Sequence, residues 1–377
     1  MSEHHLHIVS FDVPYPPNYG GVIDVFYKIR ELHRKGVRLH LHIIEYPGRN
    51  RAPELEQYCE EIRYYPRVTG IRSVLSIVPY IVKSRRSEEM MKNLLKDKYP
   101  ILFEGLHSCY YISDARLNDR LLIYRESNIE HRYYYNLFKA EHHTGKKLYF
   151  LIESLKLKLF QHKLKHAGAM LVVSDDDTAY LKKHFPGKQV FYLPSFHANS
   201  DIMIPEGKGD YTLYHGNIEV PENEAAAAFL IGKVFAGSSH RLIIAGMNPP
   251  QRIIQLASKH SNISIIANPG DDELFSLIRN AHVNILVTFQ ATGLKLKLLN
   301  TLYNGRHCLV NPPMLNGTGL DSLCHIASTP EALIKKLDEL KDRPFTHADA
   351  AGRKQVLGST YSNSLNADRM IGIIFGR

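Results

Sequence analysis

The feature that most restricts the fold of this chain is a repeated order of short apolar segment, polar loop and helix-like segment. Residues 7–11 read as a first strand, residues 22–35 place their apolar side chains at helical spacing, and residues 38–45 read as the next strand. This order is typical of a parallel, doubly wound sheet with helices on its faces. Further strands are predicted at residues 101–103, 121–124 and 169–173.

A second series of the same kind follows a polar stretch at residues 200–210, which we interpret as a linker. Its predicted strands are 211–215, 241–245, 263–266, 283–287 and 308–310, and its predicted helices are 222–234, 250–260, 271–280 and 296–303. At 377 residues the chain is long enough for two domains, so we expect an α/β protein of two tandem Rossmann-like domains, at 1–200 and 205–358. The apolar segment at about 360–377 is expected to pack back on the first domain.

Two such domains would face each other across a cleft, because ligands of open α/β sheets bind outside the carboxyl ends of the strands. No apolar run is long enough to span a bilayer, and the N-terminus lacks the layout of a signal peptide. The four cysteines are far apart in sequence and read as reduced packing thiols. We therefore predict a cytoplasmic protein, with the inner face of the membrane as the site of any peripheral attachment.

The net charge of +9 is concentrated in the first half of the chain. Residues 1–200 contain 30 lysine and arginine residues against 22 acidic ones, and the remainder contains 17 against 16. This excess indicates an anionic partner such as membrane lipid, a lipid-diphosphate acceptor or nucleic acid, with a solvated lysine-rich surface as the alternative. Because no nucleic-acid-binding motif accompanies the charge, we predict no nucleic-acid partner.

Two segments combine apolar and basic residues. Residues 146–166 place six lysines among leucines and phenylalanines, and residues 71–86 are similar. Both compositions are typical of a surface that lies on an anionic membrane. The alternative for residues 146–166 is a helix packed on the core with a basic outer face.

The strongest local signal is a glycine loop that opens a helix. Gly293 begins the run and Asn304-Gly305 ends the helix before a buried strand. The free N–H groups and partial positive charge of a helix N-terminus favour a diphosphate. Lys295 and Lys297 fall in the first turn, where a cation is ordinarily unfavourable, so they indicate a bound anion. The alternative is a solvated helix start.

This run resembles the donor segment of family-4-like GT-B glycosyltransferases. Other stretches resemble motifs of that family in the same order: Tyr19-Gly20-Gly21, residues 124–131, His215-Gly216-Asn217, Pro221-Glu222-Asn223, Ala245-Gly246 and residues 268–274. The resemblance covers most of the chain. It implies transfer of a hexose, with mannose as one candidate, from a UDP- or GDP-linked sugar to a glycan or lipid-linked acceptor in surface polysaccharide synthesis. It also implies retention at the anomeric carbon, and we predict neither a cofactor nor a metal ion.

The same comparison assigns site residues. The expected donor-binding residues are Gly216, Asn217, Gly246, Asn268, Gly293, Lys295, Lys297 and Asn300. The resemblance implies that His107, just after a predicted strand, contacts the donor sugar near the reacting carbon, with an ordinary loop histidine as the alternative.

Four further residues are candidates for the acceptor. Gly20 and Gly21 would let the backbone approach it, or would form a tight turn. Arg125 would hold an acceptor phosphate and Glu130 would orient a hydroxyl group. A plain salt bridge between Arg125 and Glu130 is the alternative.

The chain departs from the resembling family at one pair of positions. The family places two glutamates eight residues apart around the glycine loop, where this chain has Thr292 and Asn300. An asparagine can hydrogen-bond to a ribose hydroxyl, but it cannot form the stronger charge-assisted bond. The alternative function is therefore a catalytically impaired homologue that binds nucleotide or glycan for a partner enzyme.

Other activities fit the sequence less well. The run Ser174-Asp175-Asp176-Asp177 could suggest a metal site, but we interpret it as a helix capping box. No other cluster has metal-ligand spacing. No GxGxxG follows the first strand, so a NAD-dependent enzyme is not predicted. A sugar-nucleotide epimerase would need acid and base carboxylates that the pattern does not identify.

Overall fold

The computed structural model describes residues 3–46, 48–141, 143–289 and 296–376. The chain divides into two compact units, the first formed by Met1–His197 with Asn363–Arg377 and the second by Ala198–Ser362. The division falls after residue 197, whereas the sequence placed the end of the first domain at residue 200.

The stretch interpreted as a linker packs on the second unit. The backbone N–H of Met203 donates to the carbonyl of Tyr303 at 2.9 Å, and Gly207 pairs with Phe345 in an antiparallel bridge. A free linker would leave these backbone groups to solvent. Residues 200–210 are therefore part of the second unit.

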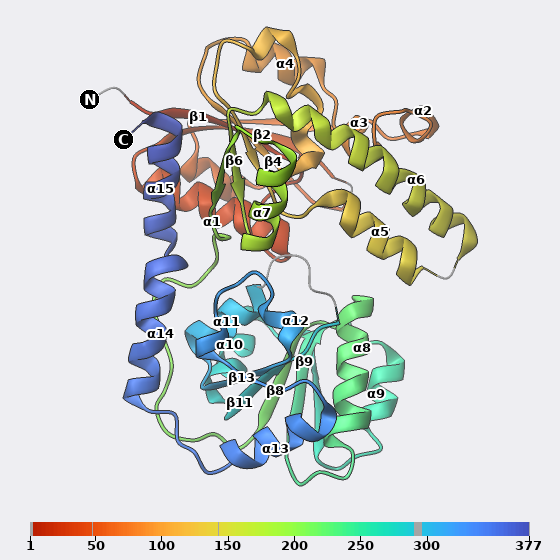
Figure 1. Ribbon diagram of the computed structural model, residues 1–377, viewed down its shortest axis with the longest axis vertical. Helices are drawn as coiled ribbons and strands as arrows, with labels where there is room; N and C mark the ends of the chain where they lie inside the picture. Colours follow the sequence, from red (N-terminus) through yellow and green to blue (C-terminus); the bar gives the residue numbers. More distant parts are fainter. Residues whose placement is uncertain (1–2, 47, 142, 290–295, 377) are drawn as a thin grey trace. The chain divides into compact units, whose positions relative to one another are not determined.

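The first unit is built on a seven-stranded, wholly parallel sheet with the order β3-β2-β1-β4-β5-β6-β7 (Figure 1). The strands are β1 His5–Ser10, β2 Arg38–Glu45, β3 Glu61–Pro66, β4 Ile101–Glu104, β5 Leu122–Arg125, β6 Ala169–Val172 and β7 Gln189–Tyr192. The α-helices are α1 Gly20–Arg34, α2 Ile71–Val74, α3 Tyr80–Lys83, α4 Glu88–Leu94, α5 Glu130–Ala140, α6 Thr144–Phe160, α7 Asp175–His184 and α15 Asn363–Phe375. Short 3-10 segments lie at Pro53–Tyr58, Leu106–Tyr111, Ala115–Leu117 and Gln161–His166.

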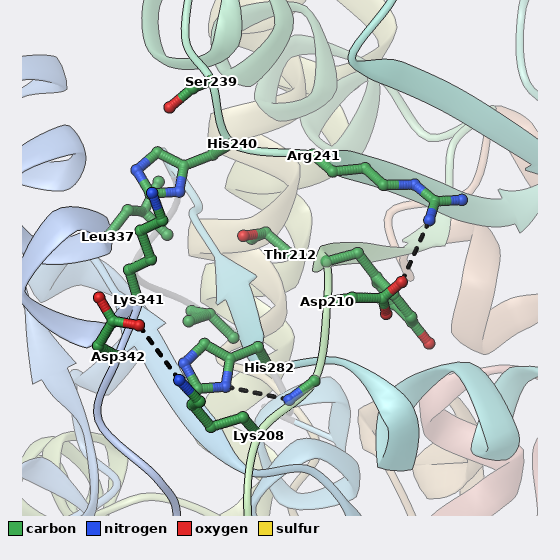
Figure 2. A pocket seen from close by; sticks show the side chains of 13 residues that line it. Lys208, Asp210, Thr212, Ser239, His240, Arg241, His282, Leu337, Lys341 and Asp342 are labelled. Carbon is green, nitrogen blue, oxygen red and sulfur yellow. Dashed lines mark hydrogen bonds and ion pairs between the residues drawn. The ribbon is translucent and has the colours of Figure 1, made fainter.

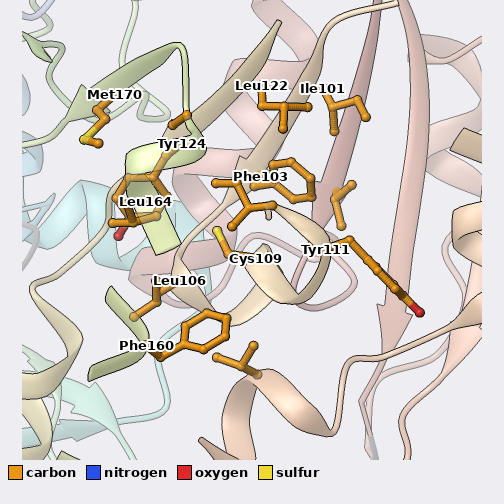
Figure 3. Close-up of a cluster of buried hydrophobic side chains, with 14 of the residues drawn as sticks. Ile101, Phe103, Leu106, Cys109, Tyr111, Leu122, Tyr124, Phe160, Leu164 and Met170 are labelled. Carbon is orange, nitrogen blue, oxygen red and sulfur yellow. The ribbon is translucent and has the colours of Figure 1, made fainter. Parts of the chain in front are cut away.

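Both faces of this sheet are covered by apolar cores because successive side chains of a strand point to opposite faces. Phe103 packs into one core, shown in Figure 3, and its neighbour Leu102 packs into the other. The second core includes α1 and α15, and Lys35, which directly follows α1, forms an ion pair of 2.8 Å with Asp368 on α15. The C-terminal segment thus packs on the first unit.

The second unit contains a six-stranded parallel sheet with the order β10-β9-β8-β11-β12-β13. Its strands are β8 Thr212–Asn217, β9 Leu242–Met247, β10 Ile263–Ala267, β11 Val283–Leu286, β12 His307–Val310 and β13 His325–Ile326. Its α-helices are α8 Pro221–Phe229, α9 Gln251–Ala257, α10 Asp271–Asn280, α11 Leu296–Asn304, α12 Pro312–Leu315, α13 Pro330–Leu340 and α14 His347–Thr360, and α8 continues as a π-helical turn at Leu230–Phe235.

Four buried charges join α1 to the ends of β4 and β5. The ammonium group of Lys28 lies 2.8 Å from carboxylate oxygens of both Asp24 and Glu104. The guanidinium group of Arg125 donates to both oxygens of Asp24 at 2.9 and 3.1 Å. Burial alone would raise the pKa of Asp24, but the charges of Arg125 and Lys28 outweigh it and hold that pKa below its usual range.

This charge cluster predicts a large loss of stability when Asp24 is neutralised. In Asp24→Asn, two buried cations would share the single carboxylate of Glu104. Breaking a buried pair in this way costs about 3–5 kcal/mol. We expect a loss of that size in the free energy of unfolding, measured by urea denaturation. Asp368→Asn, which removes an exposed partner of Lys35, should cost less than about 1 kcal/mol. Equal losses in the two variants would contradict the prediction.

Candidate functional site

His107 and Glu130 face each other at the carboxyl ends of two adjacent strands in the first unit. His107 lies in the 3-10 segment that follows β4, and Glu130 is the first residue of α5, which follows β5. The Nδ1 atom of His107 is 3.8 Å from Oε1 of Glu130, which is too far for a hydrogen bond. Both atoms are buried and have no hydrogen-bond partner among the described residues.

Both groups are uncharged at neutral pH. Burial lowers the pKa of His107 well below its usual value, and the positive charges of Arg85 and Arg67 lower it further. Burial raises the pKa of Glu130 to about 8, although Arg85 opposes this shift. The Glu130 side chain is 3% exposed, and that of His107 is 21% exposed. A neutral imidazole and a neutral carboxyl group can therefore bind a sugar hydroxyl without burying a charge.

Glu126 is a third ionisable group at this edge. It is fully buried, its Oε2 accepts a hydrogen bond from the backbone of Val173 at 3.2 Å, and its Oε1 has no partner among the described residues. Burial raises its pKa well above the usual range. Buried polar atoms are rarely left unpaired, so three of them at the ends of β4 and β5 mark a place where a ligand could complete the hydrogen bonding.

Arg125 is not placed to meet an acceptor. Its side chain is 1% exposed, and besides Asp24 it donates to the carbonyls of Leu193 at 2.6 Å and Pro194 at 3.1 Å. The alternative salt bridge with Glu130 is not formed either. The sequence analysis expected Arg125 to hold an acceptor phosphate, and the structure corrects this. The guanidinium group is bound by Asp24, which lies 101 residues earlier in the chain.

Gly20 and Gly21 open α1 after the loop that follows β1. A methyl group at Gly21 would come within 2.7 Å of the ring of Phe11, so this glycine permits close packing of the helix start on Phe11. The Phe11 ring is in turn 5.3 Å from the ring of His107, measured between centroids. The two glycines therefore lie near the His107 edge, and the structure leaves their expected contact with an acceptor as a prediction.

Lys297 lies at the corresponding edge of the second unit. It is in the first turn of α11, and its ammonium group donates to Oδ1 of Asn223 at 3.0 Å and lies 5.6 Å from the centre of the Tyr214 ring. Asn223 in turn donates to the carbonyl of Asn217 at 2.8 Å. The cation is therefore held through Asn223 at the carboxyl end of β8.

Gly246 and Asn268 extend this edge. Gly246 approaches Gly216 so closely that a methyl group on it would lie 1.8 Å from the Gly216 carbonyl oxygen. The backbone N–H of Asn268 donates to the Gly246 carbonyl at 2.8 Å, and its side chain accepts from the backbone of Asn248 at 2.8 Å. The predicted residues Gly216, Asn217, Gly246, Asn268 and Lys297 are thus brought together along one edge of the sheet.

Asn300 is directed to a different partner. Its side-chain oxygen accepts a hydrogen bond from Asn199 at 2.9 Å, and Asn199 accepts one from Asn304 at 2.7 Å. This bond uses the amide oxygen of Asn300 and not its amide N–H groups, so the expected ribose contact stays a prediction. Gly293 and Lys295, as well as Thr292, lie outside the described residues.

The acidic run after β6 is a helix start. The hydroxyl of Ser174 accepts a hydrogen bond from the backbone N–H of Asp177 at 3.1 Å, which confirms the predicted cap of α7. Among residues 3–46, 48–141, 143–289 and 296–376, no group of three His, Cys, Asp or Glu side chains is arranged to hold a metal ion. No described helix combines the length and apolar character needed to cross a membrane.

A pocket of about 290 Å³ lies at the opposite end of the second sheet, where β8, β9 and β11 begin (Figure 2). Lys208 pairs there with Asp342 at 3.1 Å, and Arg241 pairs with Asp210 at 3.4 Å. None of the predicted site residues lines it. The amino ends of parallel strands are also not where ligands of such sheets ordinarily bind.

Sequence reasoning missed two contributors to these edges. Arg85 is buried, donates to the carbonyls of Phe11 and Ile81, and acts on the charge state of both His107 and Glu130. Glu222 forms a very short contact with the hydroxyl of Thr288, just beyond β11. No local pattern marks Arg85, because its partners come from the loop after β1 and from α3.

Comparison with known proteins identifies the fold. No protein-family model matches the sequence. The chain is 26% identical over 337 residues to an uncharacterized 44.6 kDa protein in the cps region of Klebsiella pneumoniae, covering 83% of this chain and 84% of that protein. Anabaena HepE, solved with UDP and glucose, has a TM-score of 0.65 at 8% identity and full coverage of both chains. The lipopolysaccharide outer core galactosyltransferase WaaB has a TM-score of 0.61 at 12% identity and 99% coverage of both chains. The predicted α/β fold of the GT-B glycosyltransferases is thereby confirmed.

The buried carboxyl group of Glu130 predicts a pH-dependent gain in stability on substitution. With a folded-state pKa of about 8 against an ordinary value of 4.5, Glu130 binds more protons when folded, so its contribution falls as pH rises between these values. Glu130→Gln should therefore gain on the wild type in unfolding free energy as pH rises, by roughly 4 kcal/mol between about pH 5 and about pH 9. Glu89→Gln, at an exposed position on α4, should change nothing. A gain that is the same at both pH values would contradict the shifted pKa.

Proposed function

We propose that this protein is a glycosyltransferase that moves a hexose from a UDP- or GDP-linked sugar to a glycan or lipid-linked acceptor in surface polysaccharide synthesis. Mannose is one candidate sugar. The GT-B fold and the relative from a cps region support this class of activity. The observation that carries the proposal is the position of Lys297. It is held through Asn223 near Asn217, at the carboxyl edge of the second unit.

We assign the donor diphosphate to this edge of the second unit. Lys297 is in the first turn of α11, where its charge adds to the partial positive charge of the helix start. One acceptor of its ammonium group, the amide oxygen of Asn223, is uncharged, so a phosphate oxygen would be a stronger acceptor than that amide. The negative charge that grows on the departing diphosphate would be stabilised there.

We assign the acceptor hydroxyl to Glu130 in the first unit, and we keep His107 at the donor sugar near the reacting carbon. Their unpaired Nδ1 and Oε1 atoms could each hydrogen-bond to one hydroxyl group. In the retaining reaction the acceptor oxygen bonds to the anomeric carbon while the bond from that carbon to the diphosphate oxygen breaks on the same face. The acceptor proton passes to the released phosphate, and the reaction needs neither an enzyme carboxylate nucleophile nor a metal ion.

A second candidate function is a nucleotide- or glycan-binding homologue without turnover. The bond between Asn199 and Asn300 favours it, because the position expected to meet the ribose already has a protein partner. Such a protein would bind the nucleotide, but it would not cleave a nucleotide sugar and would therefore release no nucleotide from it.

Nucleotide binding is tested by thermal stabilisation of the full chain with UDP and with GDP. A ligand at 100 times its Kd adds about 2.7 kcal/mol to the stability of the folded state. We expect this shift with one of the two nucleotides and its loss in Lys297→Ala. Lys233→Ala, an exposed lysine of the second unit, should keep the shift. Retention of the full shift in Lys297→Ala would place the diphosphate elsewhere.

Turnover is tested by nucleotide release from UDP-hexoses and GDP-mannose, with membranes of capsulated Klebsiella pneumoniae as the acceptor source. His107→Ala should lower release about 100-fold or more if His107 contacts the reacting groups. His33→Ala, an exposed histidine on α1, is the matched control and should leave the rate unchanged. Nucleotide binding without release in the wild type would favour the second candidate function.

A further inference from the structure

The outer face of α6 carries an exposed apolar stripe. Leu148, Ile152, Leu155 and Leu159 are spaced four, three and four residues apart, which places them on one face of the helix, and all four are exposed. The opposite face, formed by Glu153, Ser154, Leu157 and Phe160, is buried. The helix thus has one buried face and, opposite it, an apolar stripe that is exposed to solvent.

A loop with two strongly exposed apolar side chains lies beside this stripe. Leu75 and Ile77, between α2 and α3, are 78% and 89% exposed. Two hydrogen bonds hold the loop against α6, because Lys156 donates to the carbonyl of Val74 at 2.9 Å and Glu153 accepts from the backbone of Tyr80 at 2.7 Å. We define the docking surface as Leu75, Ile77, Leu148, Ile152, Leu155 and Leu159.

Positive charge surrounds the docking surface. Lys156 and Lys158 lie on the two flanks of the stripe, and the 3-10 segment after α6 adds Lys163 and Lys165. The one acidic residue of α6, Glu153, is buried and paired with Lys156. An apolar stripe flanked by lysines matches the interface of an anionic bilayer, where apolar side chains enter the acyl boundary and cations meet the headgroups.

A second copy of the chain fits the same surface poorly. A two-fold dimer brings identical patches together, so the lysines of α6 would oppose their own counterparts. Exposed apolar side chains of this size ordinarily mark an interaction site. We infer that the docking surface binds the surface of an anionic lipid bilayer.

This binding would bring the first unit to a lipid-linked acceptor. Helices α5 and α6 lie side by side (Figure 1), and the hydroxyl of Ser154 on α6 donates to the carbonyl of His131 at 2.7 Å. His131 follows Glu130, so the docking surface and the candidate acceptor site share one helical hairpin. Binding of the docking surface to a bilayer does not depend on the transfer reaction. Only the statement that the acceptor is lipid-linked rests on the proposed function.

The test is sedimentation of the full chain with vesicles of phosphatidylcholine alone or mixed with phosphatidylglycerol. We expect binding to the mixed vesicles, weaker binding to the neutral ones, and release by salt. Ile77→Ser combined with Leu159→Ser should weaken binding about tenfold or more. Met203→Ser, a 58% exposed side chain of the second unit, is the apolar control.

A charge series separates the electrostatic part. Lys158→Gln with Lys165→Gln should weaken binding to the mixed vesicles about tenfold or more and reduce its salt dependence. Lys182→Gln with Lys183→Gln, on α7, changes the net charge equally and should have little effect. If UDP or GDP stabilises the wild type, the same stabilisation should persist in every variant. If neither nucleotide stabilises the wild type, the circular dichroism spectrum and thermal unfolding of each variant serve to show that it is folded.

Three results would overturn the inference. One is unchanged vesicle binding in the Ile77→Ser and Leu159→Ser double variant. Another is a wild-type dimer in analytical ultracentrifugation that this double variant converts to monomer, since the occupant would then be a second copy. The third is a wild type that does not bind the vesicles. Failure of vesicle binding alongside intact nucleotide release would reject the docking surface and leave the proposed function standing.

Discussion

The paired charges of Asp24, Lys28, Glu104 and Arg125 determine where the candidate acceptor site can form. Glu104 and Arg125 are the last residues of adjacent strands and are direct neighbours in the sheet. Charges removed from water must keep their partners, so α1, β4 and β5 cannot shift independently. His107 follows Glu104 by three residues and Glu130 follows Arg125 by five. The ion cluster therefore fixes the strand ends from which both residues extend.

The two sheet edges differ in the hydrogen bonding of their polar side chains. In the first unit, His107, Glu126 and Glu130 each keep a buried atom without a partner among the described residues, which disfavours the folded state until a ligand supplies the missing bond. In the second unit, Lys297 donates to the amide oxygen of Asn223. An anion there would offer this ammonium group a stronger acceptor than that amide oxygen. The first edge thus favours a hydroxyl between neutral groups, and the second favours an anion.

The sequence predicted the repeated architecture because buried parallel strands form apolar runs that can be read directly, and β2 coincides with its predicted range. It missed β3, whose charged and aromatic side chains are only partly buried at the sheet edge, and the short strands β7 and β13. Among the predicted site residues, Gly216, Asn217, Gly246 and Asn268 follow the ends of strands, and the structure places them along one edge of the second sheet. Arg125 was misassigned because the residue that binds it lies far away in sequence, and no local pattern records such a pair.

The return of α15 to the first unit gives the polypeptide a particular order of maturation. Ala367, Met370 and Ile374 complete an apolar core that includes residues of β1, β2 and α1. Domains ordinarily fold as they leave the ribosome, N-terminal first. Until residues 363–375 are translated, the apolar side chains of this core that α15 covers remain exposed. They would be available to chaperones and to aggregation while the second unit is being translated.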